Sequence, residues 1–252
     1  MITDKSKPYY ANKKIIARLG KEIFQAQKKY KGKLIIGHGQ GSFAHIPASK
    51  YQTHRGFFNK NSIKGATVTS NMAIEPNRIL MNSFIKIGLL VKTFSPASFI
   101  LAKNGNVQEI FTEPINNALR IGLVPVVYGD VIEDLDKGFC IFSTDKIFRV
   151  LTKGFSRDYK IEKIIFCSDT NGVYDAKGKT IARITQDWFA KNKGVIGGSK
   201  NTDVTGGMLH KVEECLKVAD EYGVRSLIIN GNVSANLKKA ILGEKVQETV
   251  IG

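Results

Sequence analysis

The chain has 252 residues, of which 42% are hydrophobic and 24% charged, and its formal net charge is +16. This length is enough for one large domain or two lobes with a sizeable core. No apolar run reaches the roughly 18 residues that suggest a membrane span, and the N-terminal segment lacks the apolar core of a signal peptide. We therefore expect a cytoplasmic protein that does not insert into a membrane.

The cysteines also argue for a reducing compartment. Cys140, Cys167 and Cys215 are far apart in the sequence and odd in number. This pattern matches neither a disulfide framework nor a metal-binding spacing. We expect all three to be buried and unreactive.

The positive charge is concentrated in the first third of the chain. Between Glu22 and Glu75 there is no acidic residue, whereas lysine and arginine are frequent. Two interpretations stay open: a well-solvated lysine-rich surface, or attraction of polyanions such as nucleic acid or small phosphorylated molecules. The basic residues are not interleaved with aromatic ones, as they are where single-stranded nucleic acid stacks. Small anionic ligands are therefore favoured over nucleic acid.

Apolar runs typical of strands alternate with helical patterns along the chain. The first half is expected to contain strands over 33–39 and 88–94, a helix over 107–122 that ends at Gly122, and a buried strand over 123–130. A helix over 143–155 follows, with Ser143 or Thr144 as its N-cap. The remaining elements are a strand that runs into a turn over 162–175, a long helix over 206–224 and a buried strand over 225–232. This alternation predicts an α/β fold with a mainly parallel sheet covered on both faces. Ligands of such sheets bind at the carboxyl ends of the strands.

The segment GHGQGSFAH at 37–45, which follows the apolar run KLII, is a candidate ligand loop. Gly39, Gly41 and Ala44 fit a G-x-G-x-x-A pattern, but the acidic residue that a dinucleotide site needs about 20 residues later is missing. A glycine-rich loop between a strand and a helix still presents backbone N–H groups to an anion. His45 either donates to a phosphate oxygen or is structural, whereas His38, nearer the strand, is the better candidate for a structural role.

Two later segments also follow the pattern of ligand loops. SDTNGVYD at 168–175 is either a tight turn or part of an adenine or ribose pocket. Gly206 and Gly207 open the long helix, and Lys211 lies one turn later on the same face as Gly207. Lys211 is either a solvated helix lysine or a ligand of phosphates at the helix N-terminus.

As an ordered set, seven motifs resemble the amino acid kinase superfamily, and most closely the archaeal-type isopentenyl phosphate kinases. They are ITDKSKP at 2–8, HGQGSFAH at 38–45, YGDV at 128–131, FSTDKI at 142–147, SDTNGVYD at 168–175, DVTGGMLHKVEE at 203–214 and NGN at 230–232. The resemblance implies the amino acid kinase fold, a three-layer αβα sandwich, usually as a homodimer. It implies an acceptor-binding N-terminal lobe (1–135) and a nucleotide-binding C-terminal lobe (136–252). The implied reaction uses ATP and Mg²⁺ to phosphorylate isopentenyl phosphate to isopentenyl diphosphate.

The resemblance also implies roles for individual residues. For the acceptor, Gly39, Gln40 and Gly41 resemble the phosphate cradle, His45 resembles the histidine that hydrogen-bonds that phosphate, and Gly129 and Asp130 resemble the second wall. For the nucleotide, Lys5 resembles the lysine at the donor's terminal phosphate, Lys211 the lysine that bridges the ATP phosphates, and Asp145 the aspartate that orients the catalytic lysines. Four residues resemble the wall of the family's nucleotide site: Asp169, Gly172, Val173 and Tyr174. Gly206 and Gly207 resemble the glycines beside the ATP phosphates.

These residue types fit phosphoryl transfer, which depends mainly on positioning and neutralisation of charge. An acceptor that is already a phosphate is its own nucleophile at neutral pH, so no strong general base is needed.

The sequence departs from the family pattern at two places. The family has a strand with a lysine and a GGS loop before ITDK, whereas this sequence begins at Met1 inside that motif. A wrongly assigned start or a clipped chain is the preferred explanation, and a non-catalytic nucleotide-binding relative is the alternative. Gln40 replaces a glycine of the phosphate cradle, which leaves a fosfomycin-type phosphonate kinase as the alternative for the substrate.

Overall fold

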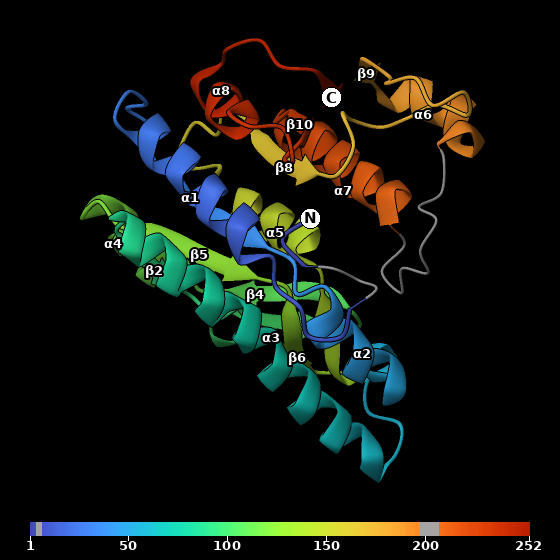
Figure 1. Cartoon of the computed structure of the whole chain (residues 1–252). Coiled ribbons are helices and arrows are strands. Elements are labelled where there is room, and N and C mark those ends of the chain that lie inside the picture. Colours follow the sequence, from blue (N-terminus) through green and yellow to red (C-terminus); the bar gives the residue numbers. More distant parts are fainter. Residues whose placement is uncertain (4–6, 197–206) are drawn as a thin grey trace. The chain divides into compact units, whose positions relative to one another are not determined.

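The computed structural model describes residues 1–3, 7–196 and 207–252. Backbone contacts divide the chain into two compact units, and Figure 1 labels many of their elements. Unit 1 comprises Met1, Arg18–Lys31 and Phe155–Gly252, and unit 2 comprises Ile2–Ala17 and Gly32–Gly154. Helix α1 (Lys13–Gln27) therefore contributes residues to both units.

Unit 2 is built on a parallel sheet with the order β1-β5-β2. Its strands are β1 (Ile36–His38), β5 (Val124–Tyr128) and β2 (Val91–Thr93), and His38 pairs with Tyr128 at the carboxyl ends. The whole of β5 is buried, as its continuous apolar sequence predicts. The helices of this unit are α2 (Ser42–Lys50), α3 (Lys60–Ile87), α4 (Glu113–Arg120) and α5 (Thr144–Phe155), with short 3-10 helices at Thr53–Arg55 and Pro96–Ser98.

A second sheet in unit 2 has the order β4-β3-β6-β7. It consists of β3 (Ile100–Lys103), β4 (Asn106–Ile110), β6 (Asp130–Asp134) and β7 (Gly138–Phe142). Asp134 joins the two hairpin turns, because its carboxylate accepts hydrogen bonds from the N–H groups of Gly105 in one turn and Lys137 in the other, at 2.6 and 2.9 Å. Burial alone raises the pKa of Asp134, but the backbone donors outweigh it and lower the pKa to about 2.

Unit 1 contains a sheet with the order β8-β10-β11-β9. Strands β8 (Ile164–Ser168) and β10 (Ser226–Asn230) are parallel, β11 (Glu248–Ile251) is antiparallel to β10, and β9 (Arg183–Ile184) is parallel to β11. Its helices are α6 (Gln186–Asn192), α7 (Gly207–Tyr222) and α8 (Asn236–Leu242), with a 3-10 helix at Lys193–Val195. Helix α8 lies beside β8 and β10 (Figure 1).

The expected alternation of strands and helices is confirmed, because β1, β2, β5, β8, β10, α5 and α7 lie within the segments predicted for them. Ser143 caps α5, since its Oγ accepts a hydrogen bond from the N–H of Lys146 at 3.3 Å.

The prediction of a helix over 107–122 is wrong for residues 107–110, which belong to strand β4. Asn104 and Gly105 both have positive φ, 49° and 76°, and connect β3 to β4 as a tight hairpin. Only Glu113–Arg120 is helical, and Gly122 follows its end with a φ of 89°.

The compact units differ in extent from the expected lobes 1–135 and 136–252. Strand β7 belongs to unit 2 because it pairs with β6, and α5 belongs there up to Gly154. The assignment of acceptor binding to one lobe and nucleotide binding to the other stays a prediction. Within the described ranges, no helix has both the length and the apolar character needed to cross a membrane.

Candidate functional site

The glycine-rich loop follows β1 and leads into α2, as the sequence predicts. Gly41 is the N-cap of α2 with φ 52° and ψ −136°, a conformation that favours glycine. A Cβ at this position would also collide with the side chain of Thr3. The conformation of the loop therefore depends on glycine at residue 41. The loop lies at the carboxyl end of a parallel strand, where ligands of α/β sheets bind.

His38, at the end of β1, has a structural environment. It is buried, its Nε2 lies 3.1 Å from Asn77 Oδ1, and its ring stacks on Tyr128 of the neighbouring strand with the centroids 5.7 Å apart. Burial lowers the pKa of His38, more than its hydrogen bonds raise it. These contacts agree with the structural role expected for His38.

Asp130 begins β6 immediately after Gly129 and is only 3% exposed. Its carboxylate accepts hydrogen bonds from Ser70 Oγ at 3.0 Å, Ser95 Oγ at 3.1 Å and the N–H of Val131 at 2.8 Å. Burial nevertheless raises the pKa of Asp130 to about 6, because these donors offset only part of the loss of hydration. The residue is a buried acid that changes charge close to neutral pH.

The loop and the Gly129–Asp130 segment are brought together, as the resemblance implies. A Cβ built on Gly129 would lie 3.0 Å from Gln40 Oε1 and 3.1 Å from Gln40 Nε2. His45 is in the first turn of α2, where its N–H donates to the carbonyl oxygen of Gly41 at 3.1 Å.

Asp145 is held at the same strand end by helix α5. Thr144, the first residue of α5, donates from Oγ1 to the carbonyl oxygen of His38 at 2.7 Å. The helix packs closely on β1 because residue 37 is a glycine: a Cβ there would lie 2.6 Å from the ring of Phe148. The first turn of α5, which contains Asp145, is therefore near the glycine-rich loop.

In unit 1, the predicted nucleotide segment follows β8, beside the end of β10. Gly172 has a φ of 133°, and a Cβ there would collide with Thr249. Val173 is fully buried and its N–H donates to Thr249 Oγ1 at 2.8 Å, so its side chain is part of the core. Asp169 is exposed, and the Tyr174 hydroxyl accepts a hydrogen bond from the N–H of Asn171 at 3.2 Å.

Gly207 begins α7, and Lys211 follows on its second turn. The Nζ of Lys211 lies 4.4 Å from the ring centroid of Phe166 in β8, so its ammonium group is next to the sheet that carries the segment 168–175. Lys5 and Gly206 lie outside the described residues.

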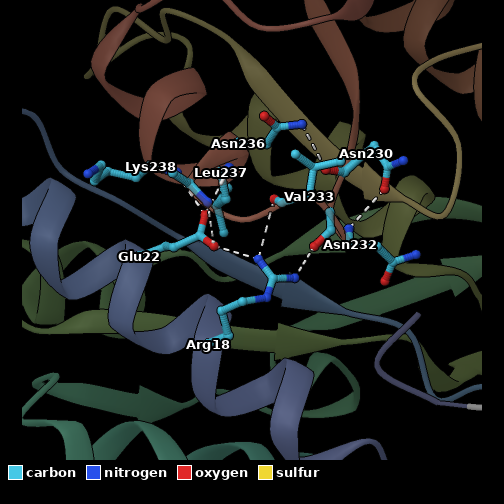
Figure 2. A network of polar contacts seen from close by, with 10 residues as sticks. Arg18, Glu22, Asn230, Asn232, Val233, Asn236, Leu237 and Lys238 are labelled. Carbon is cyan, nitrogen blue, oxygen red and sulfur yellow. Dashed lines mark hydrogen bonds and ion pairs between the residues drawn. The ribbon is translucent and has the colours of Figure 1, made fainter.

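The sequence analysis missed a polar network in unit 1, shown in Figure 2. The Glu22 carboxylate on α1 is 5% exposed and accepts hydrogen bonds from the N–H groups of Ala235 and Leu237, at 3.0 and 3.1 Å. Arg18 pairs with Glu22 and donates to the carbonyl oxygen of Gly231. The spacing of four residues on a helix is the signal that identifies such an ion pair, but it does not reveal the distant loop.

The same network extends to the predicted nucleotide segment. Asn230, at the end of β10, donates from Nδ2 to Asn171 Oδ1 at 2.9 Å, and its own Oδ1 accepts from the N–H of Asn232 at 2.9 Å. The segment 230–238, which contains the NGN motif, thus connects α1 to the turn after β8.

None of the three cysteines forms a disulfide; Cys140 and Cys215 are buried, as expected, whereas Cys167 is only partly buried. Burial raises the pKa values of Cys140 and Cys167 to about 12, which strongly disfavours the reactive thiolate at neutral pH. This agrees with the expectation of unreactive thiols for these two residues.

Comparison with known proteins identifies the class to which this fold and site belong. The model of the amino acid kinase family matches residues 1–230. A solved isopentenyl phosphate kinase structure superposes with a TM-score of 0.81 and 26% identity, covering 99% of this chain and 96% of that one. The chain belongs to the amino acid kinase family, and the predicted amino acid kinase fold is confirmed.

Within the family, two relatives that match nearly the whole chain are isopentenyl phosphate kinases. The protein of that name from Methanothermobacter thermautotrophicus is 34% identical, with 94% of this chain and 89% of the relative covered. The one from Methanocaldococcus jannaschii is 31% identical, with 97% and 92% covered.

Proposed function

We propose that this chain is an ATP-dependent kinase that phosphorylates isopentenyl phosphate to isopentenyl diphosphate. The observation that carries the proposal is the similarity to two isopentenyl phosphate kinases over nearly the full length of both chains. The glycine-rich loop at the carboxyl end of β1 supports it, because free backbone N–H groups at a helix N-terminus suit an anionic acceptor.

In this proposal the acceptor phosphate binds at Gly39, Gln40 and Gly41, with His45 as a hydrogen-bond donor and Gly129 and Asp130 as the opposite wall. An acceptor oxygen attacks the γ-phosphorus of ATP, a new P–O bond forms, and the bond to the β-phosphate oxygen breaks so that ADP leaves. The attacking oxygen is already ionised at neutral pH, so the protein supplies position and positive charge rather than a base.

The nucleotide is proposed to bind to unit 1 along Asp169, Gly172, Val173 and Tyr174 and at the start of α7. Val173 supports this wall from the core, since its side chain is fully buried and its N–H donates to Thr249 Oγ1. Lys5, Lys211 and Asp145 complete the proposed catalytic set with His45: the lysines neutralise the transferring phosphate, and Asp145 orients them. Gly206 and Gly207 allow the phosphates to approach the helix N-terminus.

We also propose that Mg²⁺ accompanies ATP. Among residues 1–3, 7–196 and 207–252, no group of three or more His, Cys, Asp or Glu side chains is placed to hold a metal ion. Mg²⁺ in kinases is usually bound by substrate phosphates and water together with one or two carboxylates. When bound, it neutralises charge on the transferred phosphate.

The proposal further includes a cytoplasmic homodimer that does not bind nucleic acid or membranes. The alternatives of a phosphonate kinase and of a non-catalytic relative are less well supported, since the two relatives from Methanothermobacter and Methanocaldococcus, which match nearly the whole chain, are isopentenyl phosphate kinases.

The test is an assay that couples ADP release to NADH oxidation, with isopentenyl phosphate, fosfomycin and N-acetylglutamate as separate acceptors. We expect turnover with isopentenyl phosphate and much less with the other two. Turnover of fosfomycin or N-acetylglutamate in preference to isopentenyl phosphate would replace the proposed substrate. ATP binding without turnover of any acceptor would favour the non-catalytic alternative.

A further inference from the structure

The side chain of Gln40 crosses from the loop after β1 to the backbone that follows β5. Both polar atoms of its carboxamide lie against Gly129, at 3.0 and 3.1 Å from the position that a Cβ would occupy there. The carbonyl oxygen of Phe142 lies 3.0 Å from the same position on another side. A Cβ at residue 129 would crowd both the Gln40 carboxamide and the Phe142 carbonyl oxygen, so the carboxamide keeps this position beside a glycine.

The carboxamide of Gln40 has donors that are not used within the described part of the chain. Gln40 is half-buried, and its carboxamide makes no hydrogen bond to any other residue that the structure describes. The group carries two N–H donors and a carbonyl acceptor, which can bind a ligand at this position. A bound anion would satisfy the donors.

The residues on both sides of Gln40 are glycines, which bears on how the loop could bind an anion. Gly39 and Gly41 on either side have no side chain, so the Gln40 carboxamide is the one side-chain donor contributed by the cradle 39–41. At Gly39 a Cβ would meet no atom of the described residues within 4 Å. The loop thus combines backbone N–H groups with a side-chain amide.

We propose that Gln40 is a specificity-determining residue of the acceptor site, whose carboxamide, seated on Gly129, donates a hydrogen bond to the acceptor phosphate. The inference rests on the proposed function and deepens it: a glutamine amide binds the phosphate at a position where the family resemblance implies a glycine. Gln40 then sets affinity for the acceptor and leaves affinity for ATP unchanged.

The first test compares the wild type, Gln40→Ala and Gln40→Glu in steady-state assays with isopentenyl phosphate and ATP varied separately. We expect Gln40→Ala to raise the KM for isopentenyl phosphate about tenfold, the effect of losing ~1.4 kcal/mol, with the KM for ATP within twofold. Gln40→Glu has nearly the same shape but opposes the phosphate charge, so it should lower kcat/KM for the acceptor further. Gln108→Ala, an exposed glutamine on β4, is the matched control.

A second test measures the coupling between Gln40 and Gly129. Gly129→Ala should displace the carboxamide and weaken acceptor binding in the wild type, but should have a smaller effect in the Gln40→Ala background. Equal effects of Gly129→Ala in both backgrounds would contradict the pairing. Thermal unfolding of each variant separates a general loss of folding from a local change.

Calorimetric titration of the ATP-free protein with inorganic phosphate separates this inference from the proposed function. If the wild type does not phosphorylate isopentenyl phosphate, the proposed function fails, yet weaker phosphate binding in Gln40→Ala than in Gln108→Ala would still support the role of Gln40. Unchanged phosphate binding, or an unchanged acceptor KM in an active enzyme, would overturn the inference.

Discussion

The carboxylate of Glu22 on α1 accepts a hydrogen bond from the N–H of Leu237 at the start of α8, 215 residues later in the chain. The same carboxylate accepts from Ala235 and Lys238 and is paired with Arg18. A single buried side chain therefore fixes the segment that joins β10 to α8 (Figure 2). Because Asn230 connects this segment to Asn171, the network also supports the proposed nucleotide wall.

Glu22→Ala is expected to lower the free energy of unfolding by about 3 kcal/mol. The substitution leaves backbone N–H groups and the Arg18 guanidinium without their buried acceptor, and such losses cost roughly 3–5 kcal/mol for a buried pair. Urea denaturation followed by circular dichroism measures the change. Glu109→Ala, at an exposed position of β4, should stay within about 0.5 kcal/mol of the wild type; equal loss in both variants would contradict the assigned role of Glu22.

Asp130→Asn is expected to change how stability depends on pH. The folded-state pKa of Asp130 is about 6, above the ordinary 3.8. The folded protein therefore holds this proton more tightly than the unfolded chain, and the stability of the wild type falls as pH rises from about 4 to about 6. The amide does not ionise, so relative to the wild type the variant should gain up to ~3 kcal/mol over that range.

Urea unfolding at several pH values between 4 and 8 measures this difference. The exposed Asp158→Asn serves as the control for removing a carboxylate. A constant difference between Asp130→Asn and the wild type across this range would show that Asp130 does not titrate there.

His45→Ala is expected to raise the KM for isopentenyl phosphate roughly tenfold or more, the effect of losing a hydrogen bond to a charged group, and to change the KM for ATP little. The assay varies each substrate at saturation of the other. His54→Ala is the matched control, because His54 is exposed and lies in the same acid-free stretch. Equal increases in both KM values would argue against a role at the acceptor phosphate.

Lys211→Ala is expected to lower kcat roughly 100-fold or more, because a cation beside the transferring phosphate acts most strongly on the transition state. Single-turnover kinetics measure the chemical step directly, with the enzyme in excess over isopentenyl phosphate and ATP at a saturating concentration. Lys191→Ala, at an exposed position of α6, should retain wild-type kcat. An unchanged kcat in Lys211→Ala would identify Lys211 as a surface lysine without a catalytic role.

Local signals were sufficient to predict the principal strands, α5 and α7, and the glycine-rich loop. Continuous apolar runs mark strands buried on both faces, and Ser143 marks the start of α5, because these preferences depend on residues a few positions apart. The prediction of a helix failed at 107–110, where the chain forms β4. The Asn104–Gly105 turn before it indicates a hairpin, but the helical pattern that follows was given more weight. The long helix α3 went unpredicted.

The sequence by itself determined that this chain alternates strands and helices, places a glycine-rich anion loop after its first strand, and carries the ordered motifs of the amino acid kinase family. Tertiary structure alone decided that the Gln40 carboxamide lies against Gly129 and that Glu22 accepts hydrogen bonds from the start of α8. It also decided that Asp130 is buried, which raises its pKa to about 6. The physical reason is that loop geometry depends on neighbouring residues, whereas burial, desolvation and hydrogen bonding depend on groups that only folding brings together.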